Sequence, residues 1–227
     1  MGSTMDRIVE LESVSKSYTQ GREQLLVLEE VDMHIRRGEF VALTGPSGSG
    51  KSTLLHLIGL LDDSFSGALR VFGHGAGSLD EDERSRLRRD KLGFVFQFDS
   101  LLPEFTVLEN IDMPARLAGR ADPAKAMALL ERFGLAEIAG KAPMEISGGE
   151  KQRAAILRGL RNSPELLIAD EPTGNLDRHN AKIVLDDLRE TGARGTAVLM
   201  VTHNEEAARC ASRILRLEAG KLSEVRL

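Results

Sequence analysis

The chain has 227 residues, with 30 Lys and Arg against 35 Asp and Glu, and it contains one Cys, one Tyr and no Trp. This length is enough for one large domain or two small ones with a core that needs no covalent cross-links, and a single Cys excludes both a disulfide framework and a multi-cysteine zinc site. The net charge of −5 argues against a general nucleic-acid binder, and the aromatic content of 4% argues against a stacking platform for single strands.

Targeting and membrane signals are missing from the sequence pattern. The longest apolar run, residues 54–61, is interrupted by His56 and Gly59 and is far shorter than the roughly 18 residues that a transmembrane helix needs. The N-terminal residues 1–10 have no apolar segment of the secretory type. We therefore expect a cytoplasmic protein.

Short apolar strands and helices follow one another along the chain. Strands are expected at residues 8–14, 26–35, 40–44, 69–72 and 92–96, and a helix at about 51–61. A mainly helical stretch follows at 107–117, 123–133 and 148–161, in which each proline is expected at a boundary or in a first turn: Pro103, Pro114, Pro123 and Pro143. Alternation then returns at 166–169, 180–190, 197–201, 205–210 and 214–217. This order predicts a parallel sheet covered on both faces, with the helical stretch inserted between strands.

The charge-rich run at residues 81–91 has two interpretations. Its arginines could contact nucleic acid, but Glu81 with Arg84 and Asp82 with Arg86 have the spacing of ion pairs on one helix face. The spacing favours a solvated helix face.

The sequence GPSGSGKS at residues 45–52 fits the phosphate-binding pattern GxxxxGK[ST] and lies between a predicted strand and a predicted helix. Backbone N–H groups of such a loop, at a helix N-terminus, bind phosphate oxygens. Lys51 is expected to reach the β- and γ-phosphates, and Ser52 to coordinate Mg²⁺. The predicted nucleotide contacts are Gly45, Ser47, Gly48, Ser49, Gly50, Lys51, Ser52 and Thr53.

Two carboxylates follow the apolar run Leu-Leu-Ile-Ala at residues 166–169. The carboxyl end of a buried parallel strand is where such sheets bind ligands. Because successive strand residues point to opposite faces, Asp170 and Glu171 have different predicted roles. Asp170 is expected to hold Mg²⁺ through water, and Glu171 to act as general base on the attacking water. The alternative is a pair of solvated residues at a strand end.

Two further polar residues follow predicted strands in the same topological position. His203 comes after residues 197–201 and could contact the γ-phosphate and orient the base or the water; a structural or surface histidine is the alternative. Gln97 comes after residues 92–96, where an amide oxygen can bind Mg²⁺ and hold a water.

The residues Ser147, Gly148, Gly149 and Glu150 have the pattern of a capping box at a helix start. Two glycines in a first helical turn cost about 1 kcal/mol each relative to Ala. A backbone that must approach an anion closely gives a reason for them.

In this order the motifs resemble those of the ATP-binding subunits of ATP-binding-cassette (ABC) transporters, over nearly the whole chain. The resemblance implies an α/β P-loop NTPase fold: a RecA-like parallel core, an antiparallel β subdomain and an inserted helical subdomain. It implies one ABC ATPase domain over residues 1–227, with the core and β subdomain at 5–97 and 163–227 and the helical subdomain at 98–162. It also assigns adenine stacking to Tyr18, the Q-loop to Gln97, the signature to residues 147–150, the D-loop to residues 175–177 with Asp177, and the switch histidine to His203.

The same resemblance implies partners. Two cassettes pair head to tail in this family, so that Ser147 and Gly149 of one chain contact the γ-phosphate bound by the other. A homodimer holding Mg²⁺ and ATP at two equivalent sites follows, docked on transmembrane permease subunits at the cytoplasmic face of the membrane and with no nucleic-acid partner.

The stretch GFVFQFDSLLPEFTVLENIDMP at residues 93–114 resembles the lipoprotein-releasing and macrolide-exporting branches of the family. This region accepts a coupling helix of the membrane subunit in the family, and its apolar residues either line that groove or pack internally: Phe98, Leu101, Leu102 and Phe105. Departures are Glu150 where Gln is commonest, Asp99 where the lipoprotein-releasing branch usually has His, and Gly159 within the helix after the signature. The alternative function is a transporter-like regulatory ATPase of the cell-wall or cell-division type that signals through a membrane partner without transport.

Overall fold

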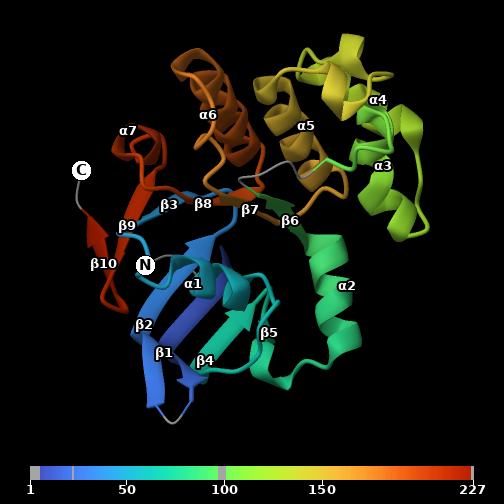
Figure 1. Ribbon diagram of the computed structural model, residues 1–227. Coiled ribbons are helices and arrows are strands. Elements are labelled where there is room, and N and C mark those ends of the chain that lie inside the picture. Colours follow the sequence, from blue (N-terminus) through green and yellow to red (C-terminus); the bar gives the residue numbers. More distant parts are fainter. Residues whose placement is uncertain (1–5, 22, 97–100, 226–227) are drawn as a thin grey trace.

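The computed structural model describes residues 6–21, 23–96 and 101–225, which form two sheets and seven α-helices among them (Figure 1). The strands are β1 Arg7–Gln20, β2 Glu23–Arg36, β3 Phe40–Thr44, β4 Ser66–Val71, β5 His74–Gly75, β6 Leu92–Val95, β7 Leu166–Asp170, β8 Ala197–Val201, β9 Arg213–Glu218 and β10 Lys221–Val225. The helices are α1 Lys51–Ile58, α2 Glu81–Lys91, α3 Val107–Leu117, α4 Pro123–Arg132, α5 Gly148–Leu160, α6 Arg178–Ala193 and α7 Glu205–Ala208.

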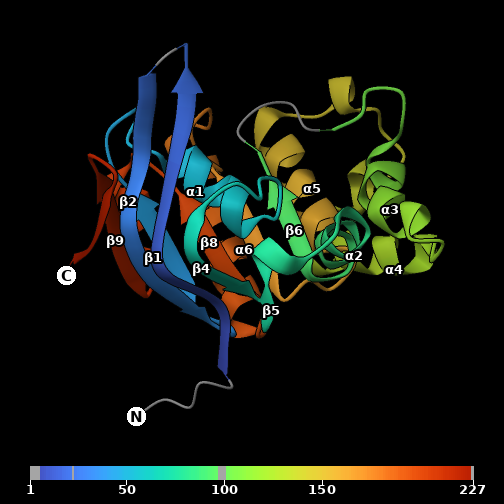
Figure 2. The same ribbon diagram turned by 90° about the horizontal axis from the view of Figure 1, so that it is seen from below.

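The larger sheet has six strands in the order β10-β9-β3-β8-β7-β6, and all its pairs from β9 to β6 are parallel. Side chains that alternate along its strands enter two separate cores. Val41 and Ile168 pack with α1 and the second sheet, whereas Ala42 and Ala169 pack with α3, α5 and α6. The expected sheet covered on both faces is therefore confirmed, and Figure 2 shows α1 between the two sheets.

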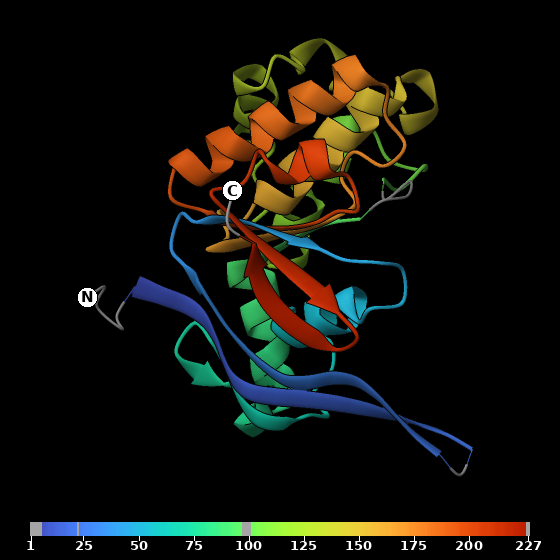
Figure 3. The same ribbon diagram turned by 90° about the vertical axis from the view of Figure 1, so that its left-hand side faces the viewer.

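The second sheet is antiparallel, with the order β2-β1-β4-β5. Its first two strands run further than the expected residues 8–14 and 26–35, and their hairpin extends away from the body of the molecule in Figure 3. Near the tip the successive residues Leu25 and Leu26 are both exposed. The alternation of buried apolar and exposed polar residues that indicates a strand is therefore absent there. Backbone pairing such as Tyr18 with Leu25 continues the ladder there.

The helices α3, α4 and α5 lie together beyond the β6 end of the large sheet (Figure 1). A buried ion pair joins two of their segments, with Arg161 Nη2 2.7 Å from Asp112 Oδ1. The prediction that Pro114 marks a boundary or a first turn is wrong, because Pro114 lies inside α3. Proline removes a single N–H donor, and the Ala118 amide still donates to the Pro114 carbonyl, so the helix continues past it.

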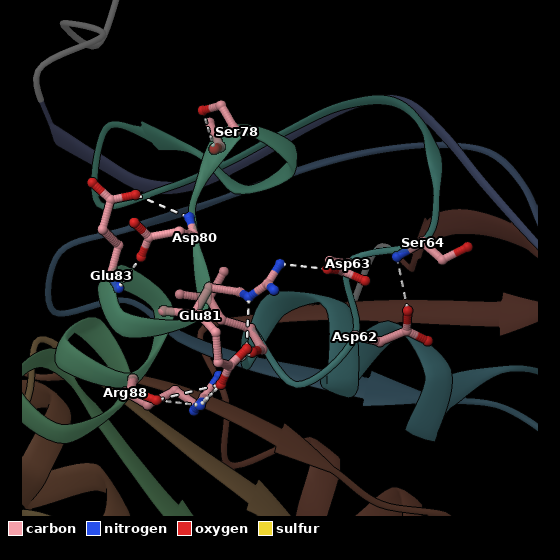
Figure 4. Close-up of polar contacts among 12 residues, drawn as sticks. Asp62, Asp63, Ser64, Ser78, Asp80, Glu81, Glu83 and Arg88 are labelled. Carbon is pink, nitrogen blue, oxygen red and sulfur yellow. Dashed lines mark hydrogen bonds and ion pairs between the residues drawn. The ribbon is translucent and has the colours of Figure 1, made fainter.

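The charge-rich run forms α2, which connects the antiparallel sheet to β6 and buries none of its own residues. A capping box between Asp80 and Glu83 starts the helix (Figure 4). The expected pair of Glu81 with Arg84 is present at 3.1 Å. Arg86 instead donates to the Asp82 carbonyl oxygen.

A close helix–strand contact accounts for Gly159. A Cβ on Gly159 would lie 2.9 Å from Leu167 Cδ1, and a Cβ on Gly93 would lie 2.4 Å from the Gly159 carbonyl oxygen. The backbones of α5 and β6 therefore touch at a distance that only two glycines allow.

No helix in the described part of the chain has both the length and the apolar character needed to cross a bilayer.

Candidate nucleotide site

The predicted site residues gather at one edge of the parallel sheet. The loop 45–50 follows β3, His203 follows β8, Asp170 ends β7 and Glu171 comes directly after it; these three strands are neighbours in the sheet. Since parallel strands present their carboxyl ends at the same edge, the order β3-β8-β7 brings the three segments together. Gln97 follows β6, the next strand, but lies outside the described residues.

The glycines of the phosphate loop are required by the backbone. Gly45 has φ 146°, and a Cβ there would lie 2.1 Å from the Leu217 carbonyl oxygen. Gly50 has φ 102°, and a Cβ there would lie 2.9 Å from the Val27 carbonyl oxygen. Gly48 has φ 76° and faces open space. The loop thus wraps tightly against β9 and β2 on one side and is open on the other.

The loop presents donors suited to an anion. Lys51 Nζ donates to the carbonyl oxygens of Gly45 at 3.0 Å and Pro46 at 2.7 Å, so its ammonium lies across the loop. The hydroxyl of Ser49 is buried and makes no hydrogen bond to the described residues. Ser52 and Thr53 lie in the first turn of α1, whose N-terminus points its free N–H groups into the same loop.

Asp170 and Glu171 are adjacent but differ in their surroundings. Burial, followed by the charge of Glu171, raises the pKa of Asp170, and the charges of His56 and Lys51 only partly offset this. Asp170 shares its strand face with Ile168, which packs on the α1 side of the sheet. The Asp170 carboxylate is therefore a half-buried anion on the side of the phosphate loop.

Glu171 is held against His203. Its φ is 46°, an uncommon value for a residue with a side chain, and its amide donates to the Val201 carbonyl oxygen at 2.9 Å. Its Oε1 lies 2.7 Å from His203 Nδ1 and accepts the His203 backbone N–H at 2.9 Å. The carboxylate is mostly covered while the imidazole is 69% exposed. The structure therefore places Glu171 and His203 in direct contact.

Oxygen donors at this edge fit a magnesium ion. The hydroxyl of Ser52 and the carboxylate of Asp170 are hard ligands, and Mg²⁺ is commonly held by one or two protein groups with phosphate oxygens completing its shell. The described residues contain no cluster of three or more His, Cys, Asp or Glu that could hold a metal ion without other ligands.

The signature residues start α5. Ser147 Oγ accepts the Glu150 amide at 3.3 Å, and Glu150 Oε2 accepts from both the hydroxyl and the amide of Ser147, at 2.7 and 2.8 Å. These two bonds hold the pKa of Glu150 below its usual range. Glu150 therefore stays ionised as part of a complete capping box, which accounts for its presence in the signature.

The two signature glycines differ. Gly148 faces open space, as a close approach to an anion would require, whereas a Cβ on Gly149 would lie 2.4 Å from Asn180 Oδ1. Packing within the chain is therefore a second reason for Gly149. Asn180 is in turn tied to Asp177, the D-loop carboxylate that caps α6 through the Asn180 amide at 3.0 Å. Asn180 is not predicted from the sequence, where its only local signal is its place three residues after Asp177.

Tyr18 lies near the tip of the β1–β2 hairpin and is 40% exposed. Its hydroxyl lies 3.4 Å from Asp62 Oδ2, in the turn after α1. The helix that begins at the phosphate loop thus leads to the residue that contacts the tyrosine.

Comparisons with known proteins agree with this geometry. The family model described as ABC transporter matches residues 28–174, which include the phosphate loop, the signature and the Asp170–Glu171 pair. The lipoprotein-releasing system ATP-binding protein LolD of Paramagnetospirillum magneticum is 47% identical over 221 residues, covering 96% of this chain and 98% of that protein. LolD of Pseudomonas syringae pv. tomato is 48% identical over 222 residues, covering 96% and 97%.

Solved structures give the same result. A dimeric post-hydrolysis structure of the ATP-binding cassette MJ0796 bound to ADP and Pi aligns with a TM-score of 0.86 and 37% identity, covering 96% of this chain and 99% of that one. The α/β P-loop NTPase fold expected from the sequence is therefore confirmed. The chain belongs to the ABC transporter family and is an ATP-hydrolysing, ATP-binding cassette.

Proposed function

We propose that this chain is the ATP-hydrolysing subunit of a transporter that releases lipoproteins from a membrane, acting as a homodimer beneath transmembrane permease subunits at the cytoplasmic face. The observation that carries the hydrolytic part is the contact of Glu171 with His203 at the sheet edge that also presents Lys51. The lipoprotein part rests on relatives that cover nearly the full chain and bear that name.

Binding of ATP uses groups that the loop already directs toward an anion. Lys51 exchanges its two carbonyl partners for the β- and γ-phosphates, and the buried Ser49 hydroxyl gains a phosphate oxygen. Ser47, Gly48 and Gly50 supply backbone donors at the start of α1. The tight fit of Gly45 against Leu217 keeps the loop in this shape.

Hydrolysis needs a base beside the γ-phosphate. Glu171 accepts the proton of the attacking water, and His203 fixes the carboxylate through its ring nitrogen and its backbone amide. Ser52, Asp170 and Gln97 would hold Mg²⁺, which would neutralise phosphate charge there. That cation would offset the burial that raises the pKa of Asp170.

The site is completed by a second copy of the chain. Ser147, Gly148 and Gly149 present an N-terminal helix turn to the γ-phosphate of the partner, and Asp177 lies in the adjoining loop at the start of α6. Support comes from MJ0796, whose two matching structures are dimeric.

A groove of about 420 Å³ is the proposed docking surface for a permease helix. Residues in or next to α2, β6, α3 and α5 line it, among them the apolar Phe94, Phe96 and Leu117 and the cationic Arg88 and Arg89. Of the residues expected either to line a groove or to pack internally, none that the structure describes is part of this lining, and Leu101 fits internal packing. Leu101 is buried in the core, Leu102 is exposed, and Phe98 lies outside the described residues.

Replacing Glu171 with Gln tests the hydrolytic assignment. The variant keeps the size of the side chain and loses the base, so we expect ATP binding to be retained and steady-state turnover to fall by about 100-fold or more. Turnover near the wild-type rate would contradict the assignment. Thr196→Ser, a substitution far from the sheet edge in the loop before β8, serves as the control that should leave turnover unchanged.

Purification from native membranes tests the partner. We expect the wild-type chain to recover permease subunits and a lipoprotein cargo, and Leu117→Asp to lose them while keeping its basal ATPase, because a charge is then placed in the apolar groove. Recovery of a membrane partner together with a cell-wall hydrolase and no lipoprotein would favour the regulatory alternative. Retention of the permease by Leu117→Asp would contradict the groove assignment.

A further inference from the structure

The only tyrosine of the chain has a buried cation behind it. Lys16 is 4% exposed, and its Nζ lies 4.8 Å from the centroid of the Tyr18 ring. An ammonium at this distance from an aromatic face is attracted by the ring quadrupole. One face of the ring is therefore occupied by Lys16, while Tyr18 as a whole remains 40% exposed.

A single carboxylate fixes both side chains. Asp62 accepts from Lys16 Nζ, with distances of 2.8 Å to Oδ1 and 2.7 Å to Oδ2, and its Oδ2 lies 3.4 Å from the Tyr18 hydroxyl. The Ser64 amide also donates to Asp62, as Figure 4 shows. Burial acts to raise the pKa of Asp62, but the bonds from Lys16 and Ser64 outweigh it and hold that pKa below its usual range.

The turn that carries Asp62 is itself held in place. Its neighbour Asp63 lies 2.6 Å from Arg84, a residue of α2 that also pairs with Glu81. The Asp62 amide donates to the His56 carbonyl oxygen in α1, the helix that begins at the phosphate loop. Through Asp62, Tyr18 is therefore connected to α1, the helix that begins at the phosphate loop.

We propose that Lys16 and Asp62 are positioning residues for adenine: they clamp the Tyr18 ring from behind and at its hydroxyl, so that its free face is presented at a fixed distance from the phosphate loop. This inference rests on the proposed binding of ATP at Gly45–Ser52 and goes beyond it. A ring that is ordered before binding loses less conformational freedom when adenine stacks on it. Lys16 and Asp62 themselves touch no part of the nucleotide.

The clamp predicts a selective effect on the base. In Lys16→Met/Asp62→Asn, both charges are removed together, so that neither is left buried alone. We expect the Kd for ATP to rise about three- to tenfold, because the ring must then be ordered as adenine stacks on it, while the Kd for inorganic tripolyphosphate stays unchanged. The single variant Lys16→Arg keeps the cation, so its affinity for ATP should stay close to that of the wild type.

A matched control lies elsewhere in the chain. Lys91 Nζ is 5.3 Å from the centroid of the Phe72 ring and 2.9 Å from Glu165, which repeats the cation, ring and carboxylate arrangement away from the nucleotide. Lys91→Met should leave both affinities unchanged. Because the chain has one Tyr and no Trp, its intrinsic emission reports Tyr18 alone. ATP should quench this emission in the wild type, and tripolyphosphate should not.

The outcomes separate the two proposals. A rise in the Kd for ATP alone, with greater acrylamide quenching of the Tyr18 emission in the free variant, supports the clamp. Equal weakening of ATP and tripolyphosphate, or no change in either, overturns it. Failure of the wild-type chain to bind both ligands would instead overturn the proposed function.

Discussion

Asp170 is the last residue of β7 and Glu171 follows it, and the two carboxylates have different electrostatic surroundings. Asp170 lies on the α1 side with its pKa raised by burial and by its neighbour, whereas Glu171 is anchored by His203. Burial of the Asp170 charge lowers the stability of the chain, and in the proposed function this free energy is recovered when Mg²⁺ binds there. Under that proposal the residue trades stability of the nucleotide-free chain for metal affinity.

This trade predicts the effect of Asp170→Asn on stability. A carboxyl whose folded pKa is raised contributes stability that is present below its unfolded pKa of about 4 and is lost as the pH rises through the folded value. At pH 7 the variant should therefore be more stable than the wild type without nucleotide, by less than about 1 kcal/mol because the group is only half-buried. Urea unfolding at pH 7 and near pH 4 measures the difference in free energy of unfolding between variant and wild type, which should vanish near pH 4.

Asp177→Asn provides a control of opposite sign. Hydrogen bonds from Asn180 lower the pKa of Asp177, so its contribution is present above its unfolded pKa and is lost as the pH falls through the lower folded value. This variant should be less stable than the wild type at pH 7. A loss of stability in Asp170→Asn at pH 7 would contradict the account of the strand end.

The site residues that the sequence identified carry local patterns, and those that it missed do not. The phosphate loop and the Asp170–Glu171 pair each occupy a few consecutive positions beside a strand. Lys16 and Asp62 are 46 residues apart in the sequence. Asn180 lies outside the signature sequence and adjoins it only through the close approach of its side chain to Gly149. Their roles depend on tertiary contacts, which spacing along the chain does not reveal.

At the scale of elements, the contact of α5 with β6 sets the position of the signature helix against the parallel sheet. The two elements meet at Gly93 and Gly159, where the backbones touch. The same glycines line the groove proposed for the permease helix. A single contact thus supports the fold and shapes the docking surface.

Gly93→Ala tests this contact. The added methyl would lie 2.4 Å from the Gly159 carbonyl oxygen, so α5 and β6 must separate, and we expect a loss of about 1–3 kcal/mol in the free energy of unfolding. Gly140→Ala is the matched control, because a Cβ there meets nothing within 4 Å. Equal stability of the two variants by urea unfolding would show that the contact is not as tight as described.

Element boundaries followed from the sequence where burial is strong and failed where it is weak. The expected strands 40–44 and 197–201 coincide with β3 and β8, whose residues are nearly all buried. By contrast, β10 was not expected at all, since most of Lys221–Val225 is exposed and its order comes from pairing with β9. The length of the β1–β2 hairpin escaped prediction for the same reason.

At the scale of the whole molecule, each chain carries one phosphate loop and one signature, and the two are expected to act on different nucleotides. The phosphate loop begins α1 between the two sheets, while the signature begins α5 among the inserted helices (Figure 1). A second copy therefore completes both sites of the proposed dimer at once. In the proposed function, ATP joins the two chains, its hydrolysis separates them, and this motion is passed to the membrane subunits.

Sedimentation of Glu171→Gln with and without ATP tests this account most directly. Without nucleotide the chain should sediment at its monomer mass of 24.8 kDa, and saturating MgATP should shift it to a dimer that persists because turnover is blocked. Ser147→Arg in the same background should bind ATP and remain monomeric, since a bulky cation then stands at the signature helix start. A monomer at saturating ATP, with binding intact in Glu171→Gln, would contradict the shared site.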